Sequence, residues 1–263
     1  MSLSSFYTAA SGMEAQSTNI DVISHNLANV NTAGFKRSKA DFQDLYYNSL
    51  SIAGAASSSD TMIPTANQVG LGTKVSAVAR VNSQGDYQLT GNELDMAIDG
   101  EGYFQIITPD GETAYTRAGS FKLDGDGNIV NTEGYLLEPQ ITVPNDSIQL
   151  TVGPDGTVTV LTAGETTPTE LGTIETVRFP NPTGLIGLGK TLFVESETSG
   201  SPTTGTPGED GLGTITQGFL EMSNVSVVEE MVNMILAQRA YEINGKAIQT
   251  SDEMLQVANN IKR

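Results

Sequence analysis

The sequence predicts an α+β fold in which long N- and C-terminal helices pack as a coiled-coil-like pair, with a mainly antiparallel β body inserted between them. Two observations support this prediction. Near each end of the chain, apolar residues recur every seven positions, which places them on one narrow stripe of a helix. Between the ends this period is absent, and short apolar runs alternate with turn signals, as in a domain built of hairpins.

The N-terminal helix is expected from about Ser4 to Asn29, within a first domain of residues 1–35. The run that follows Asn29 ends the helix, because Asn and Gly tolerate left-handed backbone and Gly34 is a natural C-terminal cap. The predicted packing stripe of this helix is Phe6, Met13, Ile20 and Leu27.

The C-terminal helix is expected to begin after Ser226 and to continue to near Lys262, in a last domain of residues 223–263. Ser226 and Glu229 have the spacing of a capping box, in which each side chain bonds a backbone N–H near the other. The predicted stripe of this helix is Val227, Met231, Met234, Tyr241, Ile248 and Leu255.

A second domain, residues 36–70, is predicted to hold a short amphipathic helix over residues 39–50 and then a loop. Residues 51–68 are rich in Ser, Ala, Gly and Thr and lack periodicity, which is typical of an extended or mobile loop. The apolar side chains on one side of the short helix are Phe42, Leu45 and Tyr46.

The β body is expected over residues 71–222. Its turns, at residues 109–111, 124–128 and 154–156, supply the Gly or Asn that tight hairpins need for positive φ. The strand-like runs are residues 74–81, 103–108, 114–116, 120–123, 129–130, 148–152, 157–161, 174–179 and 192–195.

The net charge of −18 is unevenly distributed along the chain. Residues 1–45 carry 4 acids and 3 bases, residues 223–263 carry 5 and 4, and residues 46–222 carry 22 and 6. The near-neutral ends can pack closely against copies of themselves. The acidic body is a poor partner for nucleic acid or an anionic membrane, so we expect neither.

Composition excludes further classes of site and segment. The absence of cysteine excludes disulfides and thiolate metal sites. No run approaches the roughly 20 apolar residues of a membrane span. The first basic residue is Lys36, so we expect no cleavable signal peptide.

Two short motifs are similar to ligand sites but lack the required context. Residues 184–191 match the phosphate-loop pattern G-x-x-x-x-G-K-[ST], yet a strand-like run follows where that loop needs a helix. Residues 124–128 are similar to the opening of a calcium loop, but Ile129 and Tyr135 stand where Gly and Glu are required. We expect no nucleotide site at the first and a hairpin turn at the second.

Catalytic groups do not converge in the sequence. Glu93, Asp95, Asp99 and Glu101 cluster, but an acidic body produces such clusters without function. The single histidine, His25, lies within the first helix, and no nucleophile is marked. We therefore expect no enzyme, no cofactor and no metal. The alternative from another class is a secreted acidic β-rich hydrolase or binding protein with helical ends.

An alternative is that the two terminal helices of one chain pack only with each other. A two-helix hairpin is marginal in water, because ordering its backbone costs more entropy than one narrow apolar stripe offsets. More helices are needed around the pair, and copies of the same chain can supply them.

Four segments carry a resemblance to a known family. Residues 24–37 contain the motif residues Asn26, Asn29, Asn31, Gly34 and Phe35, and residues 223–242 contain Arg239 and Tyr241. Residues 100–104, Gly-Glu-Gly-Tyr-Phe, and residues 115–121, Tyr-Thr-Arg-Ala-Gly-Ser-Phe, lie in the body. Together these segments resemble the axial proteins of the bacterial flagellum, the family of rod and hook subunits, over nearly the whole chain.

Within this family, the chain length and residues 46–68 resemble the distal-rod subgroup. An insertion at this place is associated in the family with a straight, stiff rod, whereas hook proteins usually carry a further outer domain. A proximal rod subunit or a hook-type subunit is the alternative. The residues taken to represent the stiffness segment are Tyr46, Gly54, Ser58 and Pro64.

The resemblance implies a structural subunit that polymerises with itself into a hollow helical rod and transmits motor torque to the hook. It implies export through the flagellar type III apparatus into the periplasm-spanning rod of the basal body. The implied partners are proximal rod subunits, the hook or its junction, and the surrounding ring bushing. From the marginal helix pair we expect the chain ends to be largely disordered in the free monomer and to fold on joining the rod.

Overall fold

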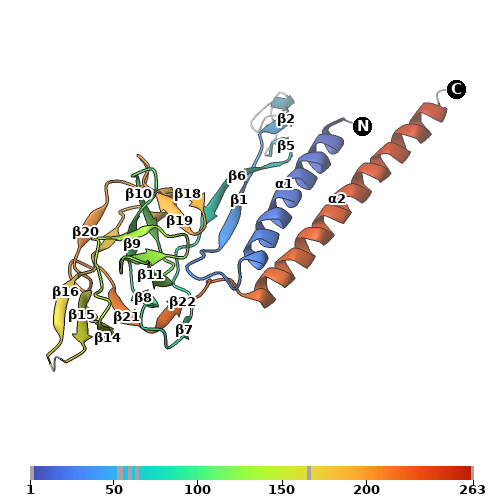
Figure 1. The fold of residues 1–263 in the computed structure, drawn as a ribbon. Helices are drawn as coiled ribbons and strands as arrows, with labels where there is room; N and C mark the ends of the chain where they lie inside the picture. Colours follow the sequence, from blue (N-terminus) through green and yellow to red (C-terminus); the bar gives the residue numbers. More distant parts are fainter. Residues whose placement is uncertain (1–2, 52–55, 59–60, 63–64, 165–166, 262–263) are drawn as a thin grey trace. The chain divides into compact units, whose positions relative to one another are not determined.

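The computed structural model describes residues 3–51, 56–58, 61–62, 65–164 and 167–261, and its ribbon is drawn in Figure 1. Its contacts divide the chain into two units. Unit 1 contains the two chain ends, up to Ala28 and from Ser226, together with Ser38–Ala79. Unit 2 contains Asn29–Arg37 and Arg80–Val225.

Unit 1 contains both long helices, which run antiparallel (Figure 1). Helix α1 (Leu3–Ala28) has 26 residues and α2 (Val227–Ile261) has 35. The α+β fold with paired terminal helices and a mainly antiparallel β body between them is therefore confirmed. The helix boundaries lie within a residue of those expected from the sequence.

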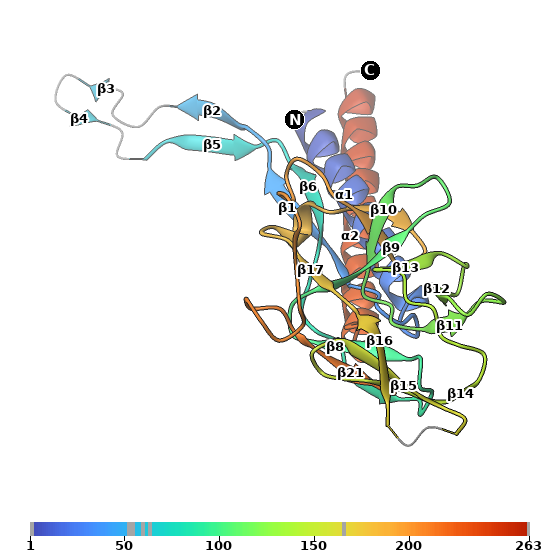
Figure 2. The ribbon, with the colours of Figure 1, turned by 60° about the vertical axis from the view of Figure 1, so that its left-hand side comes forward.

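The rest of unit 1 consists of nested strand pairs, as in one long hairpin (Figure 2). The two pairs nearer the tip of this hairpin are antiparallel. The pairs, from the base outward, are β1 (Ser38–Asp44) with β6 (Thr73–Arg80), β2 (Tyr47–Ser51) with β5 (Asn67–Gly70), and β3 (Ala56–Ser58) with β4 (Thr61–Met62).

The short helix predicted over residues 39–50 is wrong, because β1 and β2 occupy this stretch. The Asn26 side chain bonds both the N–H and the C=O of Ser38, at 2.9 and 2.8 Å, and so acts as a strand neighbour where β1 begins. Strand β6, distant in sequence, supplies the other neighbour. The loop predicted over residues 51–68 also needs correction, since its described residues include β3, β4 and the start of β5.

Unit 2 is the β body. Within its described residues, the largest sheet has nine strands in the order β11-β12-β13-β9-β10-β19-β18, and β17 pairs with β9 and β20. Unit 2 also contains a three-stranded sheet, β14-β15-β16, and the strand pairs β8–β21 and β7–β22. Neighbouring strands in these sheets are antiparallel. The bounds are β7 (Tyr87–Leu89), β8 (Met96–Asp99), β9 (Tyr103–Ile107), β10 (Thr113–Thr116), β11 (Phe121–Leu123), β12 (Ile129–Asn131), β13 (Leu136–Glu138), β14 (Ser147–Val152), β15 (Thr157–Thr162), β16 (Thr169–Thr173), β17 (Thr176–Arg178), the 3-10 helix η1 (Pro182–Gly184), β18 (Ile186–Gly189), β19 (Leu192–Val194), β20 (Thr203–Gly205), β21 (Thr214–Gln217) and β22 (Phe219–Glu221).

Unit 2 has its own core on both faces of the large sheet. Successive side chains of a strand alternate, so Phe104 packs into one apolar cluster and Tyr103 into another. In the first cluster the rings of Phe104 and Phe121 meet edge to face, with centroids 5.3 Å apart. In the second, Tyr103 packs edge to face on Phe179 and Phe193, each 6.0 Å away.

The predicted turns of the body are confirmed. The three lie between β9 and β10, β11 and β12, and β14 and β15, and Gly111, Gly127 and Gly156 have positive φ there. The apparent phosphate loop is also a hairpin. Lys190 and Thr191, with φ of 54° and 60°, join β18 to β19, and strand follows where a phosphate loop needs a helix.

Candidate assembly site

The buried apolar residues of the paired helices are mostly small. Helix α1 buries Ala9, Ala15 and Ile23, and α2 buries Ala237. A Cβ added at Gly12 would lie 2.8 Å from Nδ2 of Asn244, so the two helices approach closely there. Small side chains remove little apolar area from water, so this pair lacks a substantial core of its own.

The predicted stripes are only partly covered within one chain. The sulfur of Met13 lies 3.9 Å from where a Cβ of Gly245 would stand, which places Met13 between the helices. The half-buried stripe residues are Phe6, Met13, Ile20, Leu27, Met234 and Ile248, and the exposed ones are Val227, Met231, Tyr241 and Leu255. Their role in polymerisation stays a prediction.

Several of the most exposed apolar side chains of α2 lie outside the predicted stripe. Val228, Leu236 and Ile243 are 74%, 62% and 65% exposed. Exposed apolar surface of this kind is typical of an interaction site. The seven-residue spacing of the predicted stripe does not include these residues. The signal that reveals them is that α2 is apolar on more than one side, which a helix needs when neighbours contact it from several directions.

Asn26, a residue of the N-terminal motif, joins three elements of unit 1. Its buried amide Nδ2 donates to the carbonyl of Ser38 at 2.8 Å and to Oε2 of Glu230 at 3.2 Å. Ser38 begins β1, and Glu230 is a buried residue in the first turn of α2. Asn26 therefore fixes the end of α1 to the start of both β1 and α2.

Gly34 belongs to unit 2 and is not the cap of α1, which ends six residues earlier at Ala28. Its φ is +71°, and its N–H donates to the carbonyl of Glu221 at 2.8 Å. A Cβ at this position would lie 2.4 Å from the backbone nitrogen of Ala118. Gly34 is thus required by a close approach of two backbone segments as well as by its left-handed conformation.

The other N-terminal motif residues form a turn that precedes this contact. The carbonyl of Asn29 accepts the N–H of Thr32 at 3.2 Å, and the carbonyl of Thr32 accepts the N–H of Phe35 at 3.3 Å. Asn31 is exposed and Phe35 is half-buried. In the C-terminal motif, Arg239 pairs with Glu242 at 2.8 Å on the exposed surface of α2.

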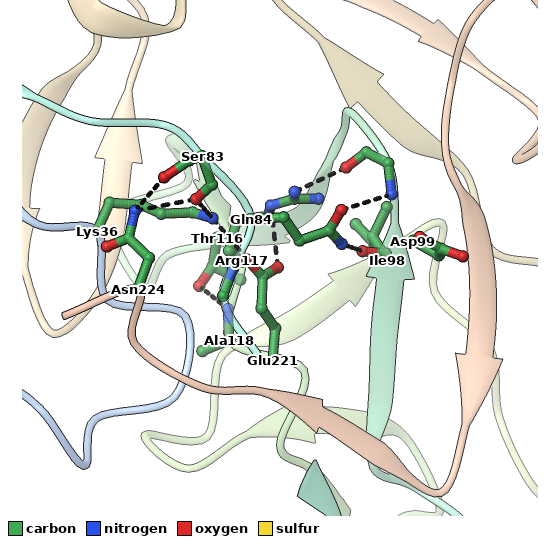
Figure 3. Close-up of polar contacts among 12 residues, drawn as sticks. Lys36, Ser83, Gln84, Ile98, Asp99, Thr116, Arg117, Ala118, Glu221 and Asn224 are labelled. Carbon is green, nitrogen blue, oxygen red and sulfur yellow. Dashed lines mark hydrogen bonds and ion pairs between the residues drawn. The ribbon is translucent and has the colours of Figure 1, made fainter. Parts of the chain in front are cut away.

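A buried charge cluster lies at the end of the N-terminal motif (Figure 3). Nζ of Lys36 is 2.5 Å from Oε1 of Glu221 and donates to the carbonyl of Ser83 at 2.9 Å. Nε of Arg117 is 3.3 Å from the other carboxylate oxygen of Glu221. Burial lowers the pKa of Lys36, and the charge of Arg117 acts in the same direction, while Glu221 opposes them. Removing one partner of such a pair leaves an uncompensated buried charge.

Asn224 adds a second connection between the same two segments (Figure 3). Its Oδ1 accepts the N–H of Arg37 at 2.7 Å, and its Nδ2 donates to the carbonyls of Val81 and Ser83, each at 2.9 Å. Residues that follow α1 are therefore held to residues that precede α2, all within unit 2. The sequence did not predict that Lys36, Glu221 and Asn224 lie together. The local signal was a lysine directly after a turn of uncharged residues.

None of the helices formed by the described residues is long and apolar enough to cross a membrane. No group of three or more His, Asp or Glu side chains is placed to hold a metal ion in the part of the chain that the structure describes.

Comparison with known families matches three parts of the chain. Residues 6–36 match the family described as flagella basal body rod protein. Residues 97–160 match the flagellar hook protein FlgE/F/G D1 domain, and residues 216–261 match the flagellar basal body rod FlgEFG protein C-terminal region.

Individual relatives match this chain over nearly their whole length. The flagellar basal-body rod protein FlgG of Borreliella burgdorferi is 51% identical over 98% of each chain. The chain belongs to the family of flagellar basal-body rod proteins. The FlgG proteins of Caulobacter vibrioides, 47% identical over 97% of this chain and 98% of the relative, and of Bacillus subtilis, 43% identical over 99% and 100%, agree with this. The protein is accordingly a structural subunit of the flagellar rod and resides in the basal body.

Proposed function

We propose that the protein forms the distal rod, polymerising with copies of itself into a hollow, stiff helical shaft that transmits motor torque to the hook. The observation that carries the proposal is the exposed apolar surface of α2, which a second copy can cover. The terminal helices line the tube around the export channel, and the acidic body faces outward. Its neighbours are proximal rod subunits, the hook or its junction, and the ring bushing.

The share of each relative's length that matches this chain supports a rod subunit over a hook subunit. The FlgG relatives match over nearly their whole length. The flagellar hook protein FlgE of Helicobacter mustelae is 41% identical over 138 residues, which is 52% of this chain and 30% of that protein. This chain therefore shares only part of a hook protein. A proximal rod subunit remains the alternative within the family.

The small-residue seam between α1 and α2 supports assembly coupled to folding. Export through the flagellar type III apparatus passes the chain to the periplasm. The terminal helices are disordered in the free monomer, and the entropy of ordering them is offset only where neighbouring helices exist.

A deletion strain tests the distal position. Basal bodies purified from it should show a truncated rod without a hook by electron microscopy, and the wild-type protein should be found in intact basal bodies by mass spectrometry. An intact rod and hook in the deletion strain would overturn the proposal.

Substitutions at exposed helix positions test the assembly surface. Ile20→Asp and Ile248→Asp should block polymerisation, but both residues are half-buried and their loss also disturbs the helix pair. Leu236→Asp and Ile243→Asp are more specific tests of the assembly surface, because both side chains are exposed in a single chain. Gln238→Asp, at an exposed polar position, is the control with the same charge change. Normal polymers from Leu236→Asp would refute this surface.

We propose further that the hairpin of residues 46–68 wedges between subunits and stiffens the rod. Tyr46 is 89% exposed at its base, and Ser58 lies on β3, whereas Gly54 and Pro64 lie outside the described residues. The N–H of Leu71 donates to the carbonyl of Tyr46 at 3.1 Å, so an Asn-Gly turn can replace residues 47–70 and close the hairpin there. This variant should polymerise with a shorter persistence length, and unchanged stiffness would contradict the wedge.

A further inference from the structure

All three arginines of residues 46–222 gather around one aromatic side chain of unit 2. The guanidinium carbon of Arg117 lies 5.8 Å from the ring centroid of Tyr103. Arg80 lies 4.6 Å above the ring of Phe193, which packs on Tyr103. Arg178 lines the same pocket as Tyr103 and Arg117. Half of the six bases of an acidic body thus lie at one place.

The pocket has a volume of about 220 Å³ and lies where residues 100–104 meet residues 115–121, the two body segments that carry the family resemblance. Gly100, Gly102 and Tyr103 come from residues 100–104, and Arg117 comes from residues 115–121. Its polar lining also includes Asn82, Gln84, Arg178 and Glu101. Figure 3 draws Gln84 and Arg117, which both line this pocket.

One donor of Arg117, a residue that lines this pocket, is left over. Arg117 is 5% exposed, its Nη2 donates to the carbonyl of Gly100 at 2.7 Å, and its Nε faces Glu221. Its Nη1 is buried and has no hydrogen-bond partner among the residues that the structure describes. A buried charged donor without a partner is costly, which favours an acceptor that completes the site.

We propose that this pocket receives a carboxylate side chain from a neighbouring copy of the chain, an inference that rests on the proposed function. The carboxylate bonds Arg178 and Nη1 of Arg117. Arg178 now pairs with Glu101 at 2.7 Å, but both side chains are about half exposed or more, so this ion pair is weak and exchangeable.

Charge identifies the occupant as a second copy. Residues 46–222 of each neighbour carry 22 acids and only 6 bases, so bodies brought together in a polymer repel one another unless cations are placed between them. Arginine and tyrosine in a partly enclosed pocket are the residue types that dominate binding energy at interfaces. A pocket with two arginines in its lining on each copy sets which face of an acidic neighbour can dock.

The first test compares Arg178→Gln with Lys122→Gln, which removes the same charge from an exposed position on β11. Arg178→Gln should raise the critical concentration for polymerisation by about tenfold, whereas Lys122→Gln should change it little. Arg178→Lys, which keeps the charge, should lie between them. Equal critical concentrations for the two glutamine variants would overturn the proposal.

A second variant separates docking from a merely structural defect. Asn82→Asp supplies a carboxylate within the same pocket, so it should raise the melting temperature of the monomer and also weaken polymerisation. A more stable monomer with wild-type assembly would show that the pocket needs an acceptor but not a neighbour, which contradicts the proposal.

Direct binding distinguishes this inference from the proposed function. N-acetylglutamate, titrated into the soluble full-length monomer, should shift the side-chain N–H resonance of Arg117 in a saturable way, and Arg178→Gln should abolish the shift. No shift in the wild-type protein overturns the pocket even if the rod assembles. A normal shift in a protein that never polymerises overturns the proposed function instead.

Discussion

The β body of unit 2 and the paired helices of unit 1 bury their apolar residues to very different extents. Phe104, Phe121 and Ile106 of the body are within 1% of complete burial. Among the residues of α2 whose burial is described, the largest buried apolar side chain is an alanine, and leucine, isoleucine and valine side chains remain exposed. The body therefore supplies its own core, whereas the helices depend on further helices from other copies.

This difference assigns separate tasks to the two regions. Because the hydrophobic core of the body is formed within one chain, the body can stay folded before and after assembly. A helix pair held by small residues has little stability alone, so polymerisation can control whether it is ordered. The four substitutions below probe the body side of this comparison, from the largest expected effect to the smallest.

Loss of a core ring should have the largest effect. Phe104→Ala is expected to lower the free energy of unfolding of the body by about 3–5 kcal/mol, because it removes a fully buried ring and leaves a cavity. Urea denaturation followed by tyrosine fluorescence measures this. Ile148→Ala, at an exposed position of the body, is the control and should cost little. Similar losses for both would mean that the body lacks a specific core.

Removal of the buried lysine should come next. Lys36→Met is expected to cost about 3 kcal/mol, at the low end for a broken buried ion pair because Arg117 still faces Glu221. The exposed neighbour Lys39, paired with Asp41 at 3.6 Å, provides the matched Lys39→Met control. Equal stability of the two variants would show that the charge cluster does not hold residues 29–37 to the body.

Substitution of the motif glycine should have an intermediate effect. Gly34→Ala is expected to cost about 2–3 kcal/mol, since it combines left-handed backbone strain with a clash against Ala118. Gly111→Ala, with φ of +81° and open space around its Cβ, isolates the strain alone at about 1–2 kcal/mol. Thermal melts of both variants give the difference. A smaller loss for Gly34→Ala would argue against the close approach to Ala118.

The smallest effect should appear in alkaline solution. Burial raises the pKa of Tyr103 above its ordinary value of 10.0. A group whose folded pKa is raised contributes stability that is present below pH 10 and lost as the pH rises through the folded pKa. Tyr103→Phe should therefore lose less stability between about pH 9 and about pH 11 than the wild type. Urea midpoints at both pH values check this, and identical losses would show that Tyr103 is accessible to ionisation in the folded body.

Local patterns in the sequence predict the helices and the hairpin turns well, because helix period and turn chemistry are local. The glycines at positions 111, 127 and 156 locate three turns correctly for this reason. The stretch 39–50 is misread, because its extended form depends on Asn26 and on β6, both remote in sequence. Strand β8 (Met96–Asp99) is missed, since a short strand buried at consecutive residues shows no alternation.

The candidate site divides in the same way. The N-terminal motif is visible in the sequence, but its meaning depends on contacts across some 185 positions, as between Lys36 and Glu221. The pocket at Arg117 likewise requires four separate segments of the body to meet. No local pattern encodes such contacts.

Hydrogen exchange of the full-length protein, as a dilute monomer and as a polymer, tests the separation of the two regions most directly. The account predicts that amides of the body strands are protected in both states, whereas amides of α1 and α2 exchange rapidly in the monomer and become protected in the polymer. Equal protection of the helices in the dilute monomer would contradict it, because the helix pair would then be stable without other copies.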